Sequence, residues 1–289
     1  MKNYQNFMMF FTFFMFWFSI QFGDIVEDSV AFVLIVSLGI LHGANDLHIL
    51  AKGKNSKMVF LKHLLVYLTI IIACVLIYLF SPFIAILLFI LLSSYHFGEE
   101  HLGEKIKVNR IFNLIFYLLY GVFLFSILFY VSLTAVNEIM QELTGITFTK
   151  IQIANAFSIS LSVLLILSIY LYVTKKIKLS VLFKEFFYLC LLSLVFKTSS
   201  LILGFAIYFI FWHSIPSLLN QVAFIYGDLT KESVVNYFKK AFIYWMISVF
   251  GLLVLYQIIP EVHLFSSIIF VLLFAVTAPH TWVMFKMKN

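Results

Sequence analysis

The sequence predicts an all-α protein, a polytopic transmembrane helix bundle of about ten helices with both termini in the cytoplasm. Of its 289 residues, 63% are hydrophobic and only 11% are charged, whereas a soluble domain carries about a quarter charged residues. The apolar runs follow one another from end to end, so we expect a single integral membrane domain over residues 1–289. The basic residues fall between these runs, so the net charge of +6 indicates membrane topology and no nucleic-acid partner.

Ten apolar runs approach the roughly 20 residues that a membrane helix needs. The first is short, and the seventh contains Lys184 and Glu185. Phe and Trp fill the region where a signal-peptide cleavage site would lie, so we interpret the first run as a retained helix. The expected helices span residues 7–22, 30–50, 60–80, 82–102, 111–134, 152–174, 180–197, 200–224, 237–259 and 262–286.

The distribution of positive charge supports an even number of helices. With a cytoplasmic N-terminus and ten alternating helices, only Lys150 and Lys197 of the 19 basic residues lie outside. The first outside loop is purely acidic, with Asp24, Glu27 and Asp28. Cytoplasmic loops of membrane proteins carry an excess of Lys and Arg. The pattern therefore predicts a multi-pass protein of the cell inner membrane.

Four histidines, each in a different predicted helix, are the main candidates for function. His42, His96, His213 and His280 belong to the second, fourth, eighth and tenth helices. In the predicted topology all four helices run inward, which places these side chains at a similar depth, roughly 18–24 Å from the outer ends at 1.5 Å per residue. A single buried histidine often just bonds a neighbouring carbonyl. Four at one depth favour a shared functional site.

Imidazole ligands suit iron, copper, zinc and nickel, so the four histidines predict one metal ion. Both cysteines, Cys74 and Cys190, lie in apolar runs outside any CxxC pair, which argues against thiolate ligands. Because each helix brings one histidine, a single non-haem ion is favoured over two bis-histidine haems. A transporter or channel with a histidine-lined pathway for a metal ion or protons is the alternative, although transport sites tend toward the membrane midplane.

Two carboxylates follow predicted ligands by four residues. Asp46 follows His42, and Glu100 follows His96. Residues four apart share a face of a helix, so each carboxylate could orient a metal-binding ring from behind. The other histidines are predicted not to bind the metal, because their positions put them at helix ends or on other helix faces: His48, His63, His101 and His263.

Four motifs, HGANDLH, YHFGEEH, FWHSIPS and PHTWVM, resemble the Brp/Blh family of bacterial and archaeal β-carotene 15,15′-dioxygenases. The resemblance extends from the second to the tenth predicted helix. It implies a membrane-embedded enzyme with Fe(2+) that uses O₂ to cleave the central 15,15′ double bond of β-carotene. The products would be two molecules of all-trans-retinal, which the family supplies to retinal-binding rhodopsins.

The resemblance also implies where the iron would bind. The ligands would be drawn from His42, His96, His213 and His280. Some members of the family carry a second histidine four residues after the position that matches His213, where this chain has Ser217. We therefore expect His280 to serve as the fourth ligand.

Overall fold

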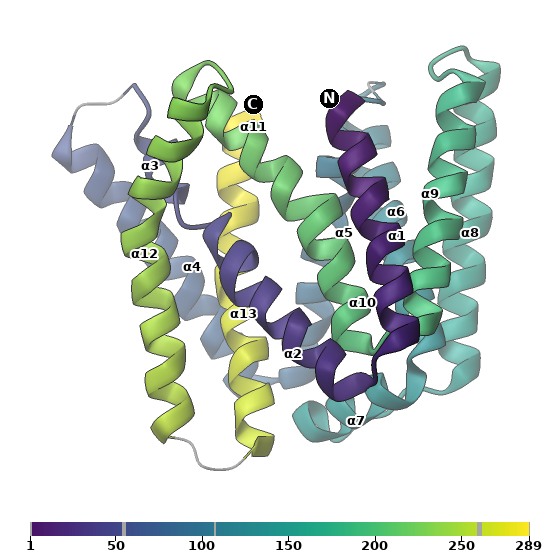
Figure 1. Cartoon of the computed structure of the whole chain (residues 1–289), viewed down its shortest axis with the longest axis horizontal. Helices are drawn as coiled ribbons and strands as arrows, with labels where there is room; N and C mark the ends of the chain where they lie inside the picture. Colours follow the sequence, from purple (N-terminus) through teal and green to yellow (C-terminus); the bar gives the residue numbers. More distant parts are fainter. Residues whose placement is uncertain (1, 54–55, 107, 259–261, 289) are drawn as a thin grey trace. The chain divides into compact units, whose positions relative to one another are not determined.

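The computed structural model describes residues 2–53, 56–106, 108–258 and 262–288, and the regular structure within these ranges is helical throughout (Figure 1). Among the described residues, six segments are long and apolar enough to cross a membrane, judged by length and composition. The predicted all-α membrane protein is thereby confirmed, while the count of ten helices and the side of the termini stay predictions. The six segments are α4 (Lys57–Phe80), α5 (Pro82–Leu102), α6 (Arg110–Val131), α8 (Lys150–Val173), α9 (Leu179–Thr198) and the run Leu201–Tyr226.

The chain forms two compact units, and neither is continuous in sequence. The first unit comprises Met1–Leu34, Ser93–Met140 and Ile146–His213, and the second comprises Ile35–Leu92, Gln141–Gly145 and Ser214–Asn289. Helix α5 and the run Leu201–Tyr226 each begin in one unit and end in the other. The single membrane domain over residues 1–289 stays a prediction.

In the first unit, helix α6 packs against α8 and α9. Helix α9 also packs against α1 (Lys2–Gln21), and α10 (Leu201–Ile207) packs against α2 (Asp24–Leu34), α6 and α9 (Figure 1). The short α7 (Leu133–Thr144) joins α6 to α8, and η2 (Tyr208–Ser214) continues α10 as a π-helical segment.

The acidic residues that the topology placed in the first loop bond the start of helix α10. The backbone N–H of Ser200 donates to Glu27 at 2.6 Å, and the Ser200 hydroxyl donates to Asp28 at 2.6 Å. The same hydroxyl accepts from the backbone N–H of Leu203, which caps the helix. Two carboxylates and one serine thus fix the beginning of the helix that leads to His213.

Helices α5 and α6 approach each other backbone to backbone through two glycines of the first unit. A Cβ added to Gly98 would lie 2.0 Å from the carbonyl oxygen of Tyr117, and one added to Gly121 would lie 2.1 Å from that of Ser94. Neither position has room for any side chain. His96 lies between Ser94 and Gly98 in the sequence, so this close contact fixes the stretch of α5 that carries His96.

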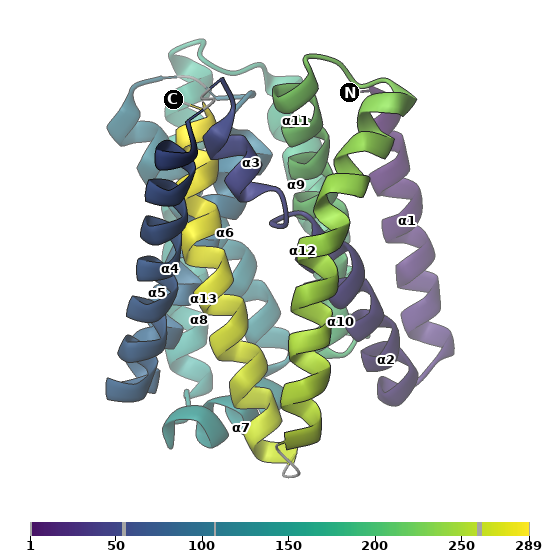
Figure 2. The ribbon, with the colours of Figure 1, turned by 90° about the vertical axis from the view of Figure 1, so that its left-hand side faces the viewer.

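In the second unit, α13 (Val262–Lys288) packs against α4 and α3 (Asp46–Ala51). Helix α3 also packs against α11 (Ile215–Tyr226), which in turn packs against α12 (Lys231–Ile258) (Figure 2). These packed helices hold Asp46 at the start of α3 and His280 on α13 within one unit.

The predicted helix over residues 30–50 is wrong as a single continuous element. Helix α2 ends at Leu34, the π-helical segment η1 (Ile35–Gly39) follows, and residues 42–45 form a turn before α3 begins at Asp46. Gly39, Gly43 and Asn45 lie in this stretch, and glycine and asparagine favour turns over helix interiors. The break changes the direction of the side chains that a regular helix would have aligned.

Candidate metal centre

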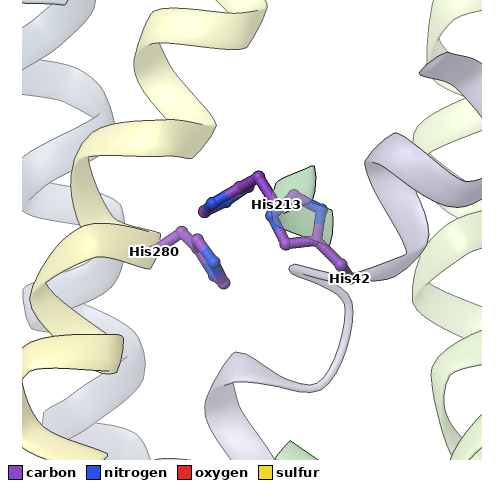
Figure 3. A group of neighbouring side chains, drawn as sticks. All are labelled: His42, His213 and His280. Carbon is purple, nitrogen blue, oxygen red and sulfur yellow. The ribbon is translucent and has the colours of Figure 1, made fainter. Parts of the chain in front are cut away.

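His42 and His280 form a ring pair within the second unit. Their ring centroids lie 4.6 Å apart at an interplanar angle of 85°, and both residues are buried. His42 lies in the turn after η1, where its Nδ1 is 2.5 Å from the carbonyl oxygen of Gly39. Figure 3 shows both rings and also draws the side chain of His213. The broken helix thus brings His42 to a histidine from the last helix of the chain.

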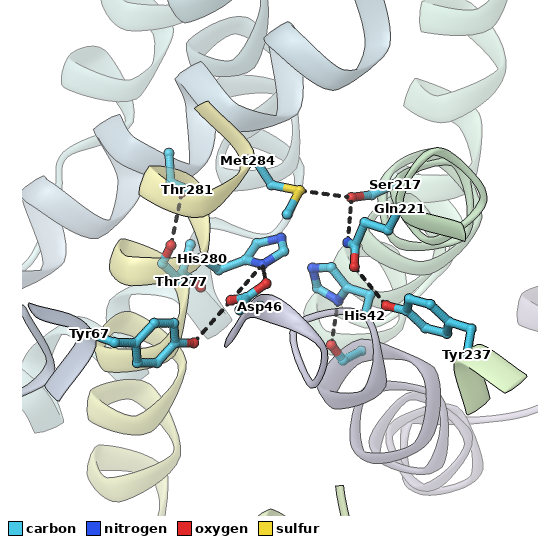
Figure 4. A network of polar contacts seen from close by, with 11 residues as sticks. His42, Asp46, Tyr67, Ser217, Gln221, Tyr237, Thr277, His280, Thr281 and Met284 are labelled. Carbon is cyan, nitrogen blue, oxygen red and sulfur yellow. Dashed lines mark hydrogen bonds and ion pairs between the residues drawn. The ribbon is translucent and has the colours of Figure 1, made fainter. Parts of the chain in front are cut away.

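A carboxylate and a phenol fix the ring of His280. Its Nδ1 lies 2.9 Å from Oδ1 and 3.1 Å from Oδ2 of Asp46, and the Tyr67 hydroxyl donates to Oδ2 at 3.1 Å (Figure 4). An ionised carboxylate only accepts hydrogen bonds, so Nδ1 of His280 is the donor. A metal ion would then be bound through Nε2, as in carboxylate–histidine–metal triads.

Asp46 therefore orients a different histidine from the one that its spacing indicated. The i+4 argument paired it with His42, but that argument requires a continuous helix, and residues 42–45 form a turn. Its observed partner, His280, is 234 positions away in the chain. Tyr67 was not foreseen at all, because no motif in the sequence links it to the histidines.

Ser217, four residues after His213, belongs to a buried polar network of the second unit (Figure 4). Its hydroxyl donates to Sδ of Met284 at 3.8 Å and accepts from Nε2 of Gln221 at 3.2 Å. The Tyr237 hydroxyl donates to Oε1 of the same Gln221 at 2.6 Å. This network joins α11 to α12 and α13, so the Ser217 hydroxyl has a structural role at this position.

His96 and His213 form a second ring pair, within the first unit. Their centroids lie 4.5 Å apart at 76°, and each residue is only 1% exposed. His213 lies in the π-helical segment η2. Such segments shift the direction of side chains relative to an α-helix and are frequent at functional sites. Phe97 and Phe209 enclose the His213 ring, with centroids at 4.6 Å and 5.8 Å.

Nothing in the sequence indicated a charge network near the second pair, which joins a buried histidine to two partly buried residues. His101, which we placed toward the cytoplasmic end of its helix as a non-ligand, is buried, and its Nε2 lies 2.6 Å from Glu185. Lys105 donates to the other oxygen of Glu185 at 2.8 Å and lies 3.2 Å from His101. Glu185 seemed to weaken the seventh predicted helix, and this network is the reason that α9 accommodates it.

The same network contacts the residue next to His213. The His101 ring stacks on Tyr120 at 5.1 Å and lies 5.9 Å from the ring of Trp212. Trp212 is 1% exposed, and its indole N–H donates to the Thr12 hydroxyl at 3.0 Å. Helices α1, α5 and α9 therefore all take part in fixing the π-helical segment that carries His213.

The remaining predicted residues lie in less distinctive surroundings. His48 is half-buried, with its ring 5.8 Å from that of Tyr244, and the ring of His63 lies 6.5 Å from that of Trp282. Glu100 is half-buried on α5. His263 belongs to the part of α13 whose side chains are outside the described residues. Their assigned roles stay predictions.

The fold and these residues together define a class of protein. It is a helical membrane protein with two buried pairs of histidines, one of which is supported by a carboxylate. The donor set is nitrogen-rich, as transition metals of the iron-to-zinc series prefer. The model of the family described as beta-carotene 15,15′-dioxygenase matches residues 33–288, and the chain belongs to this family. The match confirms the predicted membership of the Brp/Blh family. No curated protein and no solved structure matches the chain.

Proposed function

We propose that the protein is a membrane-embedded, iron-dependent oxygenase that cleaves the central 15,15′ double bond of β-carotene with O₂ to give two molecules of all-trans-retinal. Membership of the family indicates a carotene dioxygenase-like enzyme. The observation that carries the finer proposal is that the four histidines of the family-like motifs form two buried ring pairs, and Asp46 supports one of them.

We further propose that the two pairs bind one Fe(2+). All four histidines are buried, and imidazole is a ligand that iron accepts. The proposal is supported by the resemblance of the four histidine motifs to the family, which implies one iron bound by these residues. When bound, iron would supply the activation of O₂, which amino-acid side chains cannot supply.

The protein's own residues would prepare the ligands and keep the reaction dry. Asp46 holds the proton of His280 on Nδ1, which directs Nε2 of this ring to the metal. The Gly39 carbonyl does the same for His42. Phe97 and Phe209 surround the His213 ring with apolar surface. β-Carotene is an apolar rod that dissolves only in lipid, so we propose that it enters from the bilayer and that its central bond is placed beside the metal.

Expression in a bacterium that produces β-carotene tests the function directly. We expect the cells to lose their orange colour and to accumulate retinal, whereas cells with the His42→Ala variant should stay orange. Retained β-carotene with the native protein present in the membrane would contradict the proposal. Metal or proton flux in proteoliposomes of that protein would then support the transporter alternative.

The identity of the product shows which double bond is cleaved, because central cleavage gives only retinal. Chromatography separates it from the longer and shorter apocarotenals that cleavage at other double bonds gives. Because a central cut yields two identical C20 aldehydes, the ratio of retinal formed to β-carotene lost should approach two. A mixture of unequal aldehydes would show that the oxygenase class is correct and the cleaved bond is not.

A further inference from the structure

The first unit contains a small apolar cavity that none of the four paired histidines lines. It is lined by residues of helices α5, α6, α9 and α10 and of η2, which are Phe97, Leu124, Phe125, Leu128, Phe196, Phe205 and Tyr208. Helix packing around it is otherwise tight. A Cβ added to Gly204 would lie 3.2 Å from Leu128 and 3.3 Å from Phe196. These two wall residues therefore pack closely against the backbone of α10.

The size and the walls of the cavity determine what it can hold. The space open to the centre of a water-sized molecule is about 10 Å³, which corresponds to one small molecule. The exposed wall is entirely apolar, and a buried water needs two to four polar partners. Apolar cavities in proteins stay dry and take up apolar guests such as xenon. The cavity is partly open, and a small apolar gas suits it better than water, which would find no polar partner in its wall.

We propose that this cavity is a binding site for O₂ beside the His96–His213 pair. The inference rests on the proposed function for the identity of the gas. Phe97 connects the two features, because it lines the cavity while its ring lies 4.6 Å from that of His213. Tyr208 lines the cavity and begins the π-helical segment that carries His213. The same phenyl ring therefore borders the cavity and packs against the His213 ring.

Xenon tests the cavity without any need for metal or for activity. In purified protein, the methyl NMR signals of Leu124 and Leu128 should shift with xenon pressure and reach saturation. The Leu128→Phe variant, which fills the cavity, should lose the shift of Leu124. The control Leu164→Phe places the same bulk at a buried position of α8 outside the lining and should keep both shifts. Shifts that do not saturate, or that persist in Leu128→Phe, would overturn the proposal.

A milder variant guards against misfolding of Leu128→Phe. Leu128→Met nearly conserves volume and reaches further along the cavity, so it should weaken the saturable shift of Leu124 while the protein remains folded. Leu128→Phe could prove to be unfolded. In that case, a folded Leu128→Met protein that binds xenon like the native protein would overturn the proposal.

Steady-state kinetics then identify the gas. In Leu128→Phe the KM for O₂ should rise while the KM for β-carotene stays unchanged, and Leu164→Phe should alter neither. A rise in the KM for β-carotene alone would assign the cavity to the carotenoid and overturn the proposal. Saturable xenon binding in a protein that cleaves no carotenoid would uphold a gas site and refute the proposed function, so the two failures are distinguishable.

Discussion

Asp46 accepts a hydrogen bond from Nδ1 of His280, and the two residues are 234 positions apart in the chain. The first residue of the short helix α3 thereby holds a ring on the last helix. The Tyr67 hydroxyl bonds the same carboxylate from α4. Three segments of the second unit thus converge on one imidazole, and this arrangement has consequences that mutation can measure.

Asp46→Asn and Tyr67→Phe should lower iron affinity and retinal formation without abolishing either. Loss of a group that orients a metal-binding histidine typically costs about 10–100-fold. Asp46→Asn should be the more severe change, because Tyr67 reaches the ring only through the carboxylate. Iron titration and retinal assays on purified protein measure both effects. Glu232→Gln, which alters an exposed acid of the same unit, is the control, and an equal loss there would show that the effect is general.

Gly121→Ala should destabilise the first unit strongly. The added methyl would lie 2.1 Å from the carbonyl oxygen of Ser94, so α5 and α6 must separate or the variant must fail to fold. Overpacking of this kind typically costs about 1–3 kcal/mol or more. Thermal unfolding in detergent measures it. Gly251→Ala has no atom within 4 Å of the new methyl and should leave the melting temperature unchanged or raise it, since alanine favours helix.

Glu185→Gln should also destabilise the protein, because it leaves Lys105 and His101 without their carboxylate. Removal of one partner of a fully buried ion pair typically costs about 3–5 kcal/mol, and the loss should be smaller here because Lys105 and Glu185 are only partly buried. Lys184→Gln, at the exposed neighbouring position, should have little effect on thermal unfolding. Equal melting temperatures for native protein and Glu185→Gln would show that the network contributes no net stability.

The helices were predictable from the sequence because they depend on local composition. The apolar runs over residues 60–80 and 82–102 correspond closely to α4 and α5. The break at residues 42–45 was not predicted, because a run of apolar residues carries no signal for a π-helical segment. The turn residues Gly43 and Asn45 lie within the helix predicted over residues 30–50.

The partners of the charged side chains depend on tertiary contacts and could not be deduced from spacing. His101 and Glu185 are 84 positions apart, and nothing in either motif relates them. The motifs did single out the four histidines that form the ring pairs. They could not show that His42 is paired with His280 and His96 with His213.

The topology leads to a separate prediction. The inside excess of basic residues places both termini in the cytoplasm and residues 135–150 outside. A reporter that is active only in the cytoplasm should work when fused at Asn289 and fail when inserted at 135–150. Cytoplasmic activity of the inserted reporter would show that the predicted orientation is wrong, whatever the helix count.

The metal centre makes the most demanding prediction. His42→Ala, His96→Ala, His213→Ala and His280→Ala should each lose bound iron and retinal formation together, because each removes a proposed ligand. His263→Ala should keep nearly full cleavage, since the topology puts that residue at the outer end of its helix. Metal analysis of the purified variants, paired with product assays, measures both quantities.

Each variant tests a different residue of the proposed iron site. Full iron and full turnover in His280→Ala would show that another group is the fourth ligand, and the bond from Asp46 would then only support packing. The same outcome in His42→Ala or His96→Ala would refute the iron site as a whole. Iron retained without turnover in His96→Ala would instead place this residue beside the reacting molecules and leave His42, His213 and His280 as the three groups that bind the ion.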